Sequence, residues 1–324
     1  MKKFNAGYLY IVLCALIFSV VEVALKHTSG MFHPMQITVL RFLIGGAVLL
    51  PFALRVMRAR GASFSRADAF FFARLGFLFV CVAMSLYQLA VVFAPASVVA
   101  VLFSCNPVFI TVLAGLLLRE PIRKNHVLAL CLEAAAVLLI VDPLHAALDG
   151  RGVAFALLSA ALFALYSVLG KKRAARLGGI AVTSLCSLFG GAELLALLLF
   201  GHTAPGAALY ARLGLSLYVG VPILSTITAA SFPWLLYLGA VNTGLGFVFH
   251  MLAMEKTDAQ TASLVFFLKP MLAPLFALVL LREALHLNMW LGIVCFLLGS
   301  GCAVLPGVIA ARRKSAVKGT APSP

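Results

Sequence analysis

Charged side chains are scarce in this sequence, and acidic ones are the scarcest. Asp, Glu, Lys and Arg together make up 11% of the 324 residues, whereas 63% are hydrophobic and the mean hydropathy is +1.10. A soluble domain of this length would need far more polar surface to cover its core. The composition therefore argues against a soluble protein and indicates a membrane protein.

The motifs of metal sites, redox sites and common membrane enzymes are also missing. The seven cysteines are odd in number, lie in apolar runs and form no Cys-x-x-Cys pair, which indicates small core residues rather than disulfides or metal ligands. No His-Glu-x-x-His sequence or nucleophile-and-base pattern occurs, and no phosphate-binding Gly-rich loop ends in Lys-Ser or Lys-Thr. We therefore predict no enzyme activity, no metal and no cofactor, and no use of ATP by this chain.

Apolar runs of membrane-spanning length fill most of the chain. A bilayer core of about 30 Å needs roughly twenty apolar residues of helix. On that length we predict an all-α polytopic membrane protein with ten transmembrane helices, at 8–28, 35–54, 72–92, 96–117, 124–142, 152–170, 180–200, 236–254, 259–281 and 288–306. The first is predicted to be an uncleaved helix rather than a signal peptide, because Glu22 interrupts it and no small-x-small cleavage site follows.

Basic residues outnumber acidic ones by 25 to 10 and concentrate in alternate loops. With an intracellular N-terminus, ten spans place most of them in cytoplasmic loops and in a basic cytoplasmic tail, 309–324. This bias predicts a multi-pass protein of the inner (plasma) membrane with both termini in the cytoplasm, and it makes a nucleic-acid partner a poor explanation of the charge. The apolar segment 213–233 is long enough for an eleventh span, but that span would move the basic tail outside. We predict an interfacial or partly inserted segment there.

The two halves of the chain are copies of each other. Residues 106–120 read NPVFITVLAGLLLRE and residues 269–283 read KPMLAPLFALVLLRE, an offset of 163, and an earlier block, which includes Gly45-Gly46 over Gly190-Gly191, repeats at 145. The offsets differ by 18 residues, about the size of the extra apolar segment. We predict a first repeat at 1–145 and a second at 150–308. Because each holds five spans, the second must be inverted, as in secondary transporters with a substrate site between the halves.

Together these features resemble the EamA-type members of the drug/metabolite transporter superfamily. The resemblance is carried by PVFITVLAGLLLREPI, by PMLAPLFALVLLREAL, and by Glu22-x-x-x-Lys26 followed by Pro34 and LRFLIGG. It covers nearly the whole chain and departs from the family only in the stretch before the eighth span. The resemblance implies ten helices, export or exchange of small metabolites such as amino acids, and a cavity lined mainly by helices 1, 3, 4, 6, 8 and 9.

Lys269 is the strongest candidate for a substrate-binding residue. It lies about ten residues, or roughly 15 Å, into the ninth span, which places it near the midplane, and its repeat partner Asn106 lies at the same depth in the fourth. A proline follows each and frees a backbone carbonyl, at Phe103 and Phe266. A cation beside free carbonyls suits a carboxylate-bearing or zwitterionic substrate. The competing interpretation is a lysine paired with an internal acid for assembly.

Charged residues of the first two spans form a second candidate group. Glu22 and Arg41 are predicted at similar depth, so we favour a structural ion pair between them. Lys26, one turn from Glu22 on the same face, is a rival partner. The functional alternative is that Glu22 takes up and releases a proton during transport.

Four further residues are weaker candidates for the substrate site. Tyr87 and His250 occupy matching positions at the offset of 163, which predicts that they face the cavity from opposite halves. Gln88 and Tyr166 lie on spans that the resemblance places around the cavity. For such residues packing is the competing interpretation, because isolated aromatic and histidine side chains on apolar helices are usually satisfied within the core.

The sequence thus predicts a permease of small metabolites, an exporter of amino acids or related carboxylate-bearing compounds that works by alternating access. Its predicted partners are a small-molecule substrate and the lipid bilayer, and a homodimer is an open alternative to the monomer. A membrane sensor or scaffold without transport activity is the alternative function. Such a protein ordinarily carries a soluble signalling domain, and no loop or tail here is long enough for one.

Overall fold

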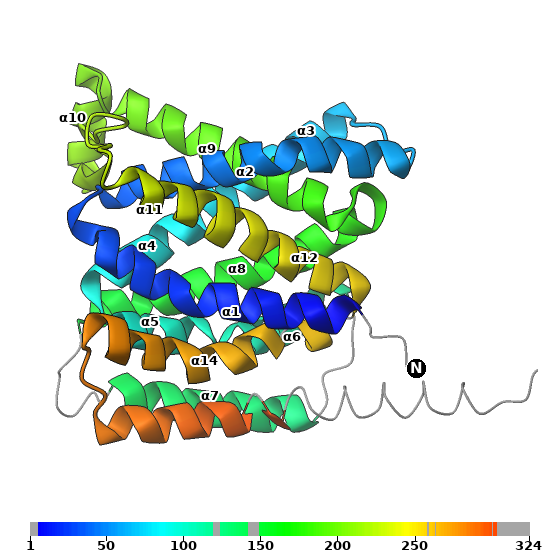
Figure 1. Cartoon of the computed structure of the whole chain (residues 1–324), viewed down its shortest axis with the longest axis vertical. Helices are drawn as coiled ribbons and strands as arrows, with labels where there is room; N and C mark the ends of the chain where they lie inside the picture. The colour runs from blue at the N-terminus through cyan, green and yellow to red at the C-terminus, as the bar shows by residue number, and fades with distance from the viewer. Residues whose placement is uncertain are drawn as a thin grey trace, which may run out of the picture.

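The structure is a computed structural model that describes residues 6–118, 124–141, 149–257, 259–262, 264–299 and 301–302. These residues form helices, most of them joined by short connections, and contain no strand. The long helices lie side by side roughly along one direction in a single bundle, and the short α10 runs across them at one end (Figure 1). The predicted repeat ends at 145 and 308, the Arg119-Glu120 pair and the tail 309–324 fall outside the described residues.

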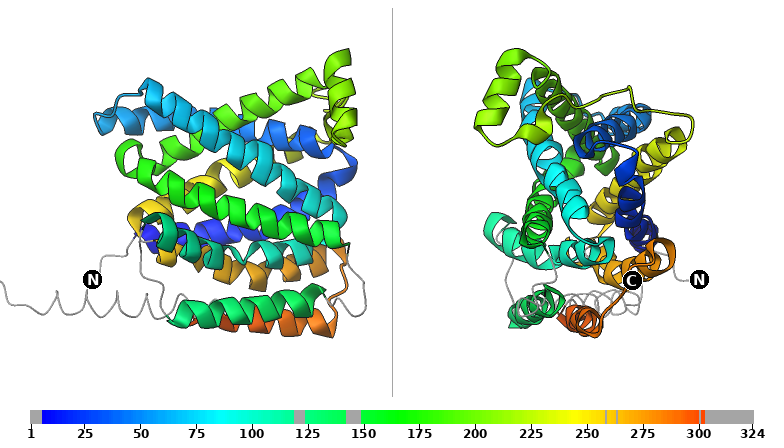
Figure 2. Two further views of the ribbon diagram at one scale, coloured as in Figure 1. Left: turned by 180° about the vertical axis from the view of Figure 1, so that it is seen from behind. Right: turned by 90° about the vertical axis from the view of Figure 1, so that its left-hand side faces the viewer.

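Eight helices of the described chain are long and apolar enough to cross a membrane. They are Ala6–Gly30, Pro34–Ala59, Arg66–Phe93, Ala96–Leu117, Gly150–Leu177, Gly179–Phe200, Phe232–Lys256 and Leu264–Leu281. The two other predicted spans fall on α7 (Lys124–Val141) and on a shorter apolar helix, Leu287–Gly299, which lie side by side at one edge of the bundle (Figure 2). The all-helical membrane fold is therefore confirmed, and the arrangement of ten spans in two inverted repeats stays a prediction.

Several spans are divided into α-helical and π-helical segments. The third and eighth spans both contain a π-helix, and the two π-helices overlap at the repeat offset of 163. Such wide turns are often found at functional sites. Besides α7, the segments are α1 (Ala6–His27), η1 (Thr28–Gly30), α2 (Pro34–Ala59), α3 (Arg66–Gly76), η2 (Phe77–Met84), α4 (Ser85–Phe93), α5 (Ala96–Phe103), α6 (Asn106–Leu118), α8 (Gly150–Leu177), α9 (Gly179–Phe200), α10 (Ala204–Arg212), η3 (Ser216–Tyr218), α11 (Phe232–Leu236), η4 (Tyr237–Gly246), α12 (Phe247–Lys256), α13 (Ala259–Ala262), α14 (Leu264–Phe276) and η5 (Ala277–Leu281).

The prolines of the repeated line act differently in the two halves. In the fourth span α5 ends at Phe103 and α6 begins at Asn106, directly before Pro107. The tight turn between them is closed by the Cys105 N–H, which donates to the Leu102 carbonyl at 3.1 Å. In the second half α14 continues through Pro270 and Pro274. The removal of one backbone donor by proline therefore breaks the first copy and is absorbed within the helix in the second.

Glycines allow helices of the two halves of the chain to pack closely. A Cβ atom placed on Gly190 would lie 2.2 Å from the carbonyl oxygen of Gly76, on α3. A Cβ on Gly45 of α2 would lie 2.8 Å from the carbonyl oxygen of Gly239 in η4. No side chain fits in either gap, so these positions bring backbones together as small residues do in membrane helix pairs.

The apolar segment before the eighth span forms no helix of spanning length. Between α10 and α11 the chain contains only the short η3, and it folds back over the bundle. Gln36, at the start of α2, donates through Nε2 to the Ile223 carbonyl at 3.0 Å and to Thr226 Oγ1 at 2.7 Å. His202, just after α9, makes a 2.8 Å hydrogen bond with the Val221 carbonyl. The segment is thus an irregular cap over one end of the bundle, without an eleventh span.

That same end of the bundle, at the left in Figure 1, is also fastened by two charged side chains. Lys26 Nζ donates to the carbonyls of Val91 at 2.8 Å and Ala94 at 3.1 Å, where α4 ends. The Glu283 carboxylate accepts from the Ala96 N–H at 2.8 Å and the Ser97 N–H at 3.0 Å, where α5 begins. A carboxylate at a helix N-terminus is stabilised by the unpaired N–H groups there.

The opposite end is held by two buried or nearly buried acids. Asp68, at the start of α3, pairs with Arg176 and, at 3.0 Å, with Arg173, both on the last turns of α8. Glu255, near the end of α12, pairs with Arg60 and accepts from the Gly179 N–H at 2.7 Å. These contacts join the ends of the second, third, sixth, seventh and eighth spans.

Candidate functional site

Three polar side chains from both halves of the chain meet in the middle of the bundle. Lys269 of α14 forms an ion pair with Glu22 of α1, and their side chains are 1% and 0% exposed. The hydroxyl of Tyr87, on α4, donates to the same carboxylate oxygen of Glu22 at 2.6 Å. The lysine thus has an internal acid as its partner, and the acid is shared by a neutral donor and a cation.

The predicted pairing of Glu22 with Arg41 or Lys26 is therefore wrong. Arg41 and Lys26 both lie near Glu22, but neither forms an ion pair with it. α1 turns its Glu22 face toward α14, whereas Lys26 is engaged by the carbonyls at the end of α4. Arg41 lies on α2 with its guanidinium carbon 4.9 Å from the ring centroid of Phe42 and 6.0 Å from that of Tyr87.

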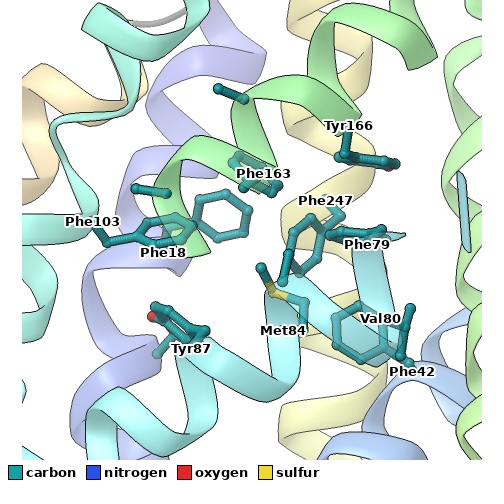
Figure 3. Packing of buried hydrophobic residues seen from close by; sticks show 14 of the residues in the cluster. Phe18, Phe42, Phe79, Val80, Met84, Tyr87, Phe103, Phe163, Tyr166 and Phe247 are labelled. Atoms are coloured by element: carbon teal, nitrogen blue, oxygen red, sulfur yellow. The ribbon is translucent and has the colours of Figure 1, made fainter. Parts of the chain in front are cut away.

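A small cavity adjoins this cluster. It offers about 20 Å³ to the centre of a water molecule, which is room for about one water. Its wall is largely aromatic, and Lys269 Nζ lies 4.8 Å from the ring centroid of Phe103. Figure 3 shows Phe18, Phe103, Tyr87, Met84 and Phe247 gathered in this part of the core. The lining residues are Phe18, Val21, Arg41, Met84, Tyr87, Phe103, Asn242, Phe247 and Lys269.

Several polar atoms around the cavity have no partner among the residues that the structure describes. They include Nε and Nη2 of Arg41, Oε2 of Glu22 and Oδ1 of Asn242. Arg41 is 1% exposed, so solvent at the protein surface does not satisfy its donors. Buried polar groups without a partner are rare in proteins, because each costs the free energy of its lost hydration. Their concentration at one cavity marks it as a candidate binding site.

Four of the predicted substrate-binding residues do not line this cavity. Asn106 donates through Nδ2 to the Ala160 carbonyl at 2.7 Å, which fixes α6 to α8. His250 makes a 3.1 Å hydrogen bond with Ser167, and Tyr166 stacks on Phe79 with 3.9 Å between ring centroids. Gln88 is buried on α4. These contacts explain how the residues are held in the bundle, and a role of any of them in substrate binding stays a prediction.

The sequence did not single out most of the cavity wall. Asn242 belongs to η4 and donates through Nδ2 to the Ile17 carbonyl at 3.3 Å. Its signal was an amide within an otherwise apolar span. Phe103 was signalled by the proline break and by its repeat partner Phe266, and Phe18 overlies Phe163 at the offset of 145, whereas Met84 and Phe247 were not singled out. Within the described ranges, His, Cys, Asp and Glu side chains form no group of three or more that could hold a metal ion.

The family model and the relatives found by comparison with known proteins are all described as transporters. The family model of EamA-like transporters matches residues 5–142 and 150–305. A protein of Clostridium kluyveri, described as an uncharacterized transporter, is 32% identical over 308 residues, which cover 93% of this chain and 92% of the relative. A protein of Archaeoglobus fulgidus with the same description is 24% identical over 276 residues, 85% of this chain and 90% of the relative. A solved crystal structure superimposes with a TM-score of 0.64 at 21% identity, covering 93% of this chain and 97% of that one, which shows the fold alone.

Proposed function

This chain belongs to the EamA-like transporter family, and we propose that it exports amino acids or related carboxylate-bearing compounds. A membrane transport function, not an enzymatic one, follows from the family and from relatives described as transporters. Eight apolar helices of spanning length support an integral membrane protein. The observation that carries the substrate proposal is the buried group of Lys269, Glu22 and Tyr87 beside a cavity that also holds Arg41.

The proposed mechanism is alternating access between two inverted five-helix repeats that together hold ten membrane-spanning helices. Support comes from the two offsets of the internal repeat and from the separate match of each half to the family model. The cavity has room for about one water, so a metabolite fits only when helices of the two halves move apart. The Glu22 and Lys269 pair joins α1 of the first half to α14 of the second, so its state is coupled to that movement.

Glu22 is the proposed proton carrier if transport is coupled to a proton gradient. Its carboxylate is buried and holds both Lys269 and Tyr87. Protonation would remove the charge that attracts Lys269 and would leave a cation without its counter-ion. The halves would then lose one of the contacts that hold them together, which links proton binding to opening.

For location we propose the inner membrane with cytoplasmic termini. The support is the concentration of basic residues at the bundle end where α2 and α8 finish, including Arg58, Arg60, Arg173 and Arg176. Cytoplasmic ends of spans carry such an excess of Lys and Arg. Light scattering of the purified protein in detergent gives its molar mass and so distinguishes a homodimer from a monomer.

Uptake into proteoliposomes tests the proposed function. Purified protein is supplied with labelled amino acids and organic acids one at a time, with and without an imposed pH gradient. We expect saturable uptake of at least one carboxylate-bearing compound and its loss in Lys269→Ala. Arg74→Ala, which removes an exposed basic residue instead, serves as the matched control and should transport normally. Absence of uptake of every compound by a folded sample would favour the sensor or scaffold function.

A further inference from the structure

We infer that Arg41, rather than Lys269, is the anchor for the carboxylate of the substrate. This inference rests on the proposed function, since it concerns the residue that binds in the same central site. Arg41 and Lys269 both line the cavity, and both are 1% exposed. Lys269 has an ion-pair partner within the protein, whereas two donors of Arg41 have none among the described residues, so Arg41 is the residue available to a ligand.

The charge of Lys269 is already balanced within the protein. Its ammonium forms the ion pair with Glu22, and its other near neighbours are the aromatic rings of Phe103 and Tyr87 at 4.8 and 5.8 Å from their centroids. A substrate carboxylate that bound Lys269 would have to displace Glu22. That exchange would leave a buried carboxylate without its cation, which is costly in a medium of low polarity.

The charge of Arg41 is attracted by the nearby Glu22 carboxylate but has no ion-pair partner of its own in the described chain. Its Nε and Nη2 make no hydrogen bond within the part of the chain that the structure describes, and no acid forms an ion pair with it there. With Glu22 and Lys269 cancelling each other, the cavity carries one uncompensated positive charge at the guanidinium. A single carboxylate on the ligand neutralises it. Two parallel N–H groups also match the two oxygens of a carboxylate, which is the geometry that guanidinium binds best.

The surroundings hold Arg41 in place for this role. Its guanidinium is 4.9 Å from the ring centroid of Phe42 and 6.0 Å from that of Tyr87, so aromatic surface supports it. α2 is attached at its start through Gln36 and is packed against η4 through Gly45. These contacts place the guanidinium at the wall of the cavity.

A further unpaired group at the cavity indicates the second feature of the ligand. Oδ1 of Asn242 lines the same cavity as an acceptor without a donor, whereas its Nδ2 is used by the Ile17 carbonyl. An N–H group of the ligand would satisfy it, and the aromatic wall is favourable for an ammonium group. The geometry thus points to a compound with one carboxylate and one amine, the class to which amino acids belong.

The first test uses the intact protein, so its result does not depend on whether a variant folds. Uptake of each labelled amino acid into proteoliposomes is measured, and for each transported one the unlabelled acid and its carboxamide are compared as competitors. We expect the acid to compete at least about 10-fold better, because the amide lacks the charge that strengthens the hydrogen bonds of Arg41. Equal competition by acid and amide would overturn the role of Arg41 while leaving transport established.

The second test compares Arg41→Lys, Arg41→Gln and the intact protein in the same assay. Arg41→Lys keeps a charge but not the paired donors and should raise KM about 10-fold or more, and Arg41→Gln should abolish the preference for acid over amide. A KM unchanged in both folded variants would overturn the inference. If the intact protein transports no amino acid at all, the proposed function fails and the inference fails with it, which is a different result from transport without acid preference.

Discussion

Removing either member of the Glu22 and Lys269 pair should destabilise the protein more than removing both. Glu22→Gln leaves the ammonium of Lys269 buried at 1% exposure without a counter-ion, and Lys269→Met leaves the carboxylate of Glu22 equally alone. Breaking a buried pair in this way costs about 3–5 kcal/mol of unfolding free energy. The double variant buries no charge in this pair. Because apolar or neutral replacements of a whole buried pair are often neutral, we expect it to lie within about 1 kcal/mol of the intact protein.

The measurement is a double-mutant cycle on protein purified in detergent. Unfolding is followed by the fluorescence of Trp234 and Trp290 while the denaturing detergent is increased, and the four unfolding free energies are compared. Tyr87→Phe is the matched control, since it removes a hydrogen bond to the same Glu22 oxygen without removing a charge. Loss of one hydrogen bond to a charged group should cost about 1.5–3 kcal/mol, less than either charge removal.

Additive losses would refute this reasoning. If the double variant is less stable by the sum of the two single losses, Glu22 and Lys269 do not compensate each other. If both single variants are as stable as the intact protein, the two side chains are solvated and the description of a dry ion pair is wrong.

Three further changes test other parts of the fold. Gly190→Ala should lower unfolding free energy by about 1–3 kcal/mol, because its Cβ would lie 2.2 Å from the Gly76 carbonyl oxygen, whereas Gly30→Ala, with nothing within 4 Å, should not; thermal melting separates the two. Asp68→Asn should cost about 1 kcal/mol, since Arg173 and Arg176 lose their acid at the end of α8 but stay partly exposed, and an unchanged melting temperature would show that this contact is not stabilising. His33 accepts a 3.3 Å hydrogen bond from the Met35 N–H at the start of α2, and burial lowers the pKa of this half-buried imidazole. Its neutral form is thus favoured in the folded chain, so its contribution is fully present above pH ~6.5 and is lost as the pH falls through the lowered folded value. The protection of the first-turn amides of α2, taken relative to their intrinsic exchange rates at each pH, should therefore fall on acidification in the intact protein and not in His33→Asn.

Much of the fold follows from apolar length, which the sequence displays directly. Eight predicted spans coincide with helices because twenty apolar residues have few alternatives in a membrane. The irregular path of the segment after α10 depends instead on contacts such as that between Gln36 and the Ile223 carbonyl. Those contacts join residues far apart in the chain, and no local pattern specifies them.

The sequence singled out the charged side chains of the central cluster, but not which of them pair. Lys269, Glu22 and Arg41 stood out because an ionisable side chain within a membrane span is costly and usually has a partner or a function. Depth along each helix could be counted, and Glu22 and Arg41 were matched on depth alone. Which faces of α1, α2 and α14 meet depends on the orientation of each helix about its own axis and on the π-helix η4. Hydrophobic periodicity specifies neither.

The connection between α4 and α5 is only two residues long, Ala94 and Pro95, and both fastenings at that end of the bundle act on it. Lys26 holds its incoming side and Glu283 its outgoing side, one from each half of the chain. If the contact of either Lys26 or Glu283 is lost, the other still holds the same turn of backbone. This end of the bundle therefore opens only when both contacts, one from each half of the chain, are lost.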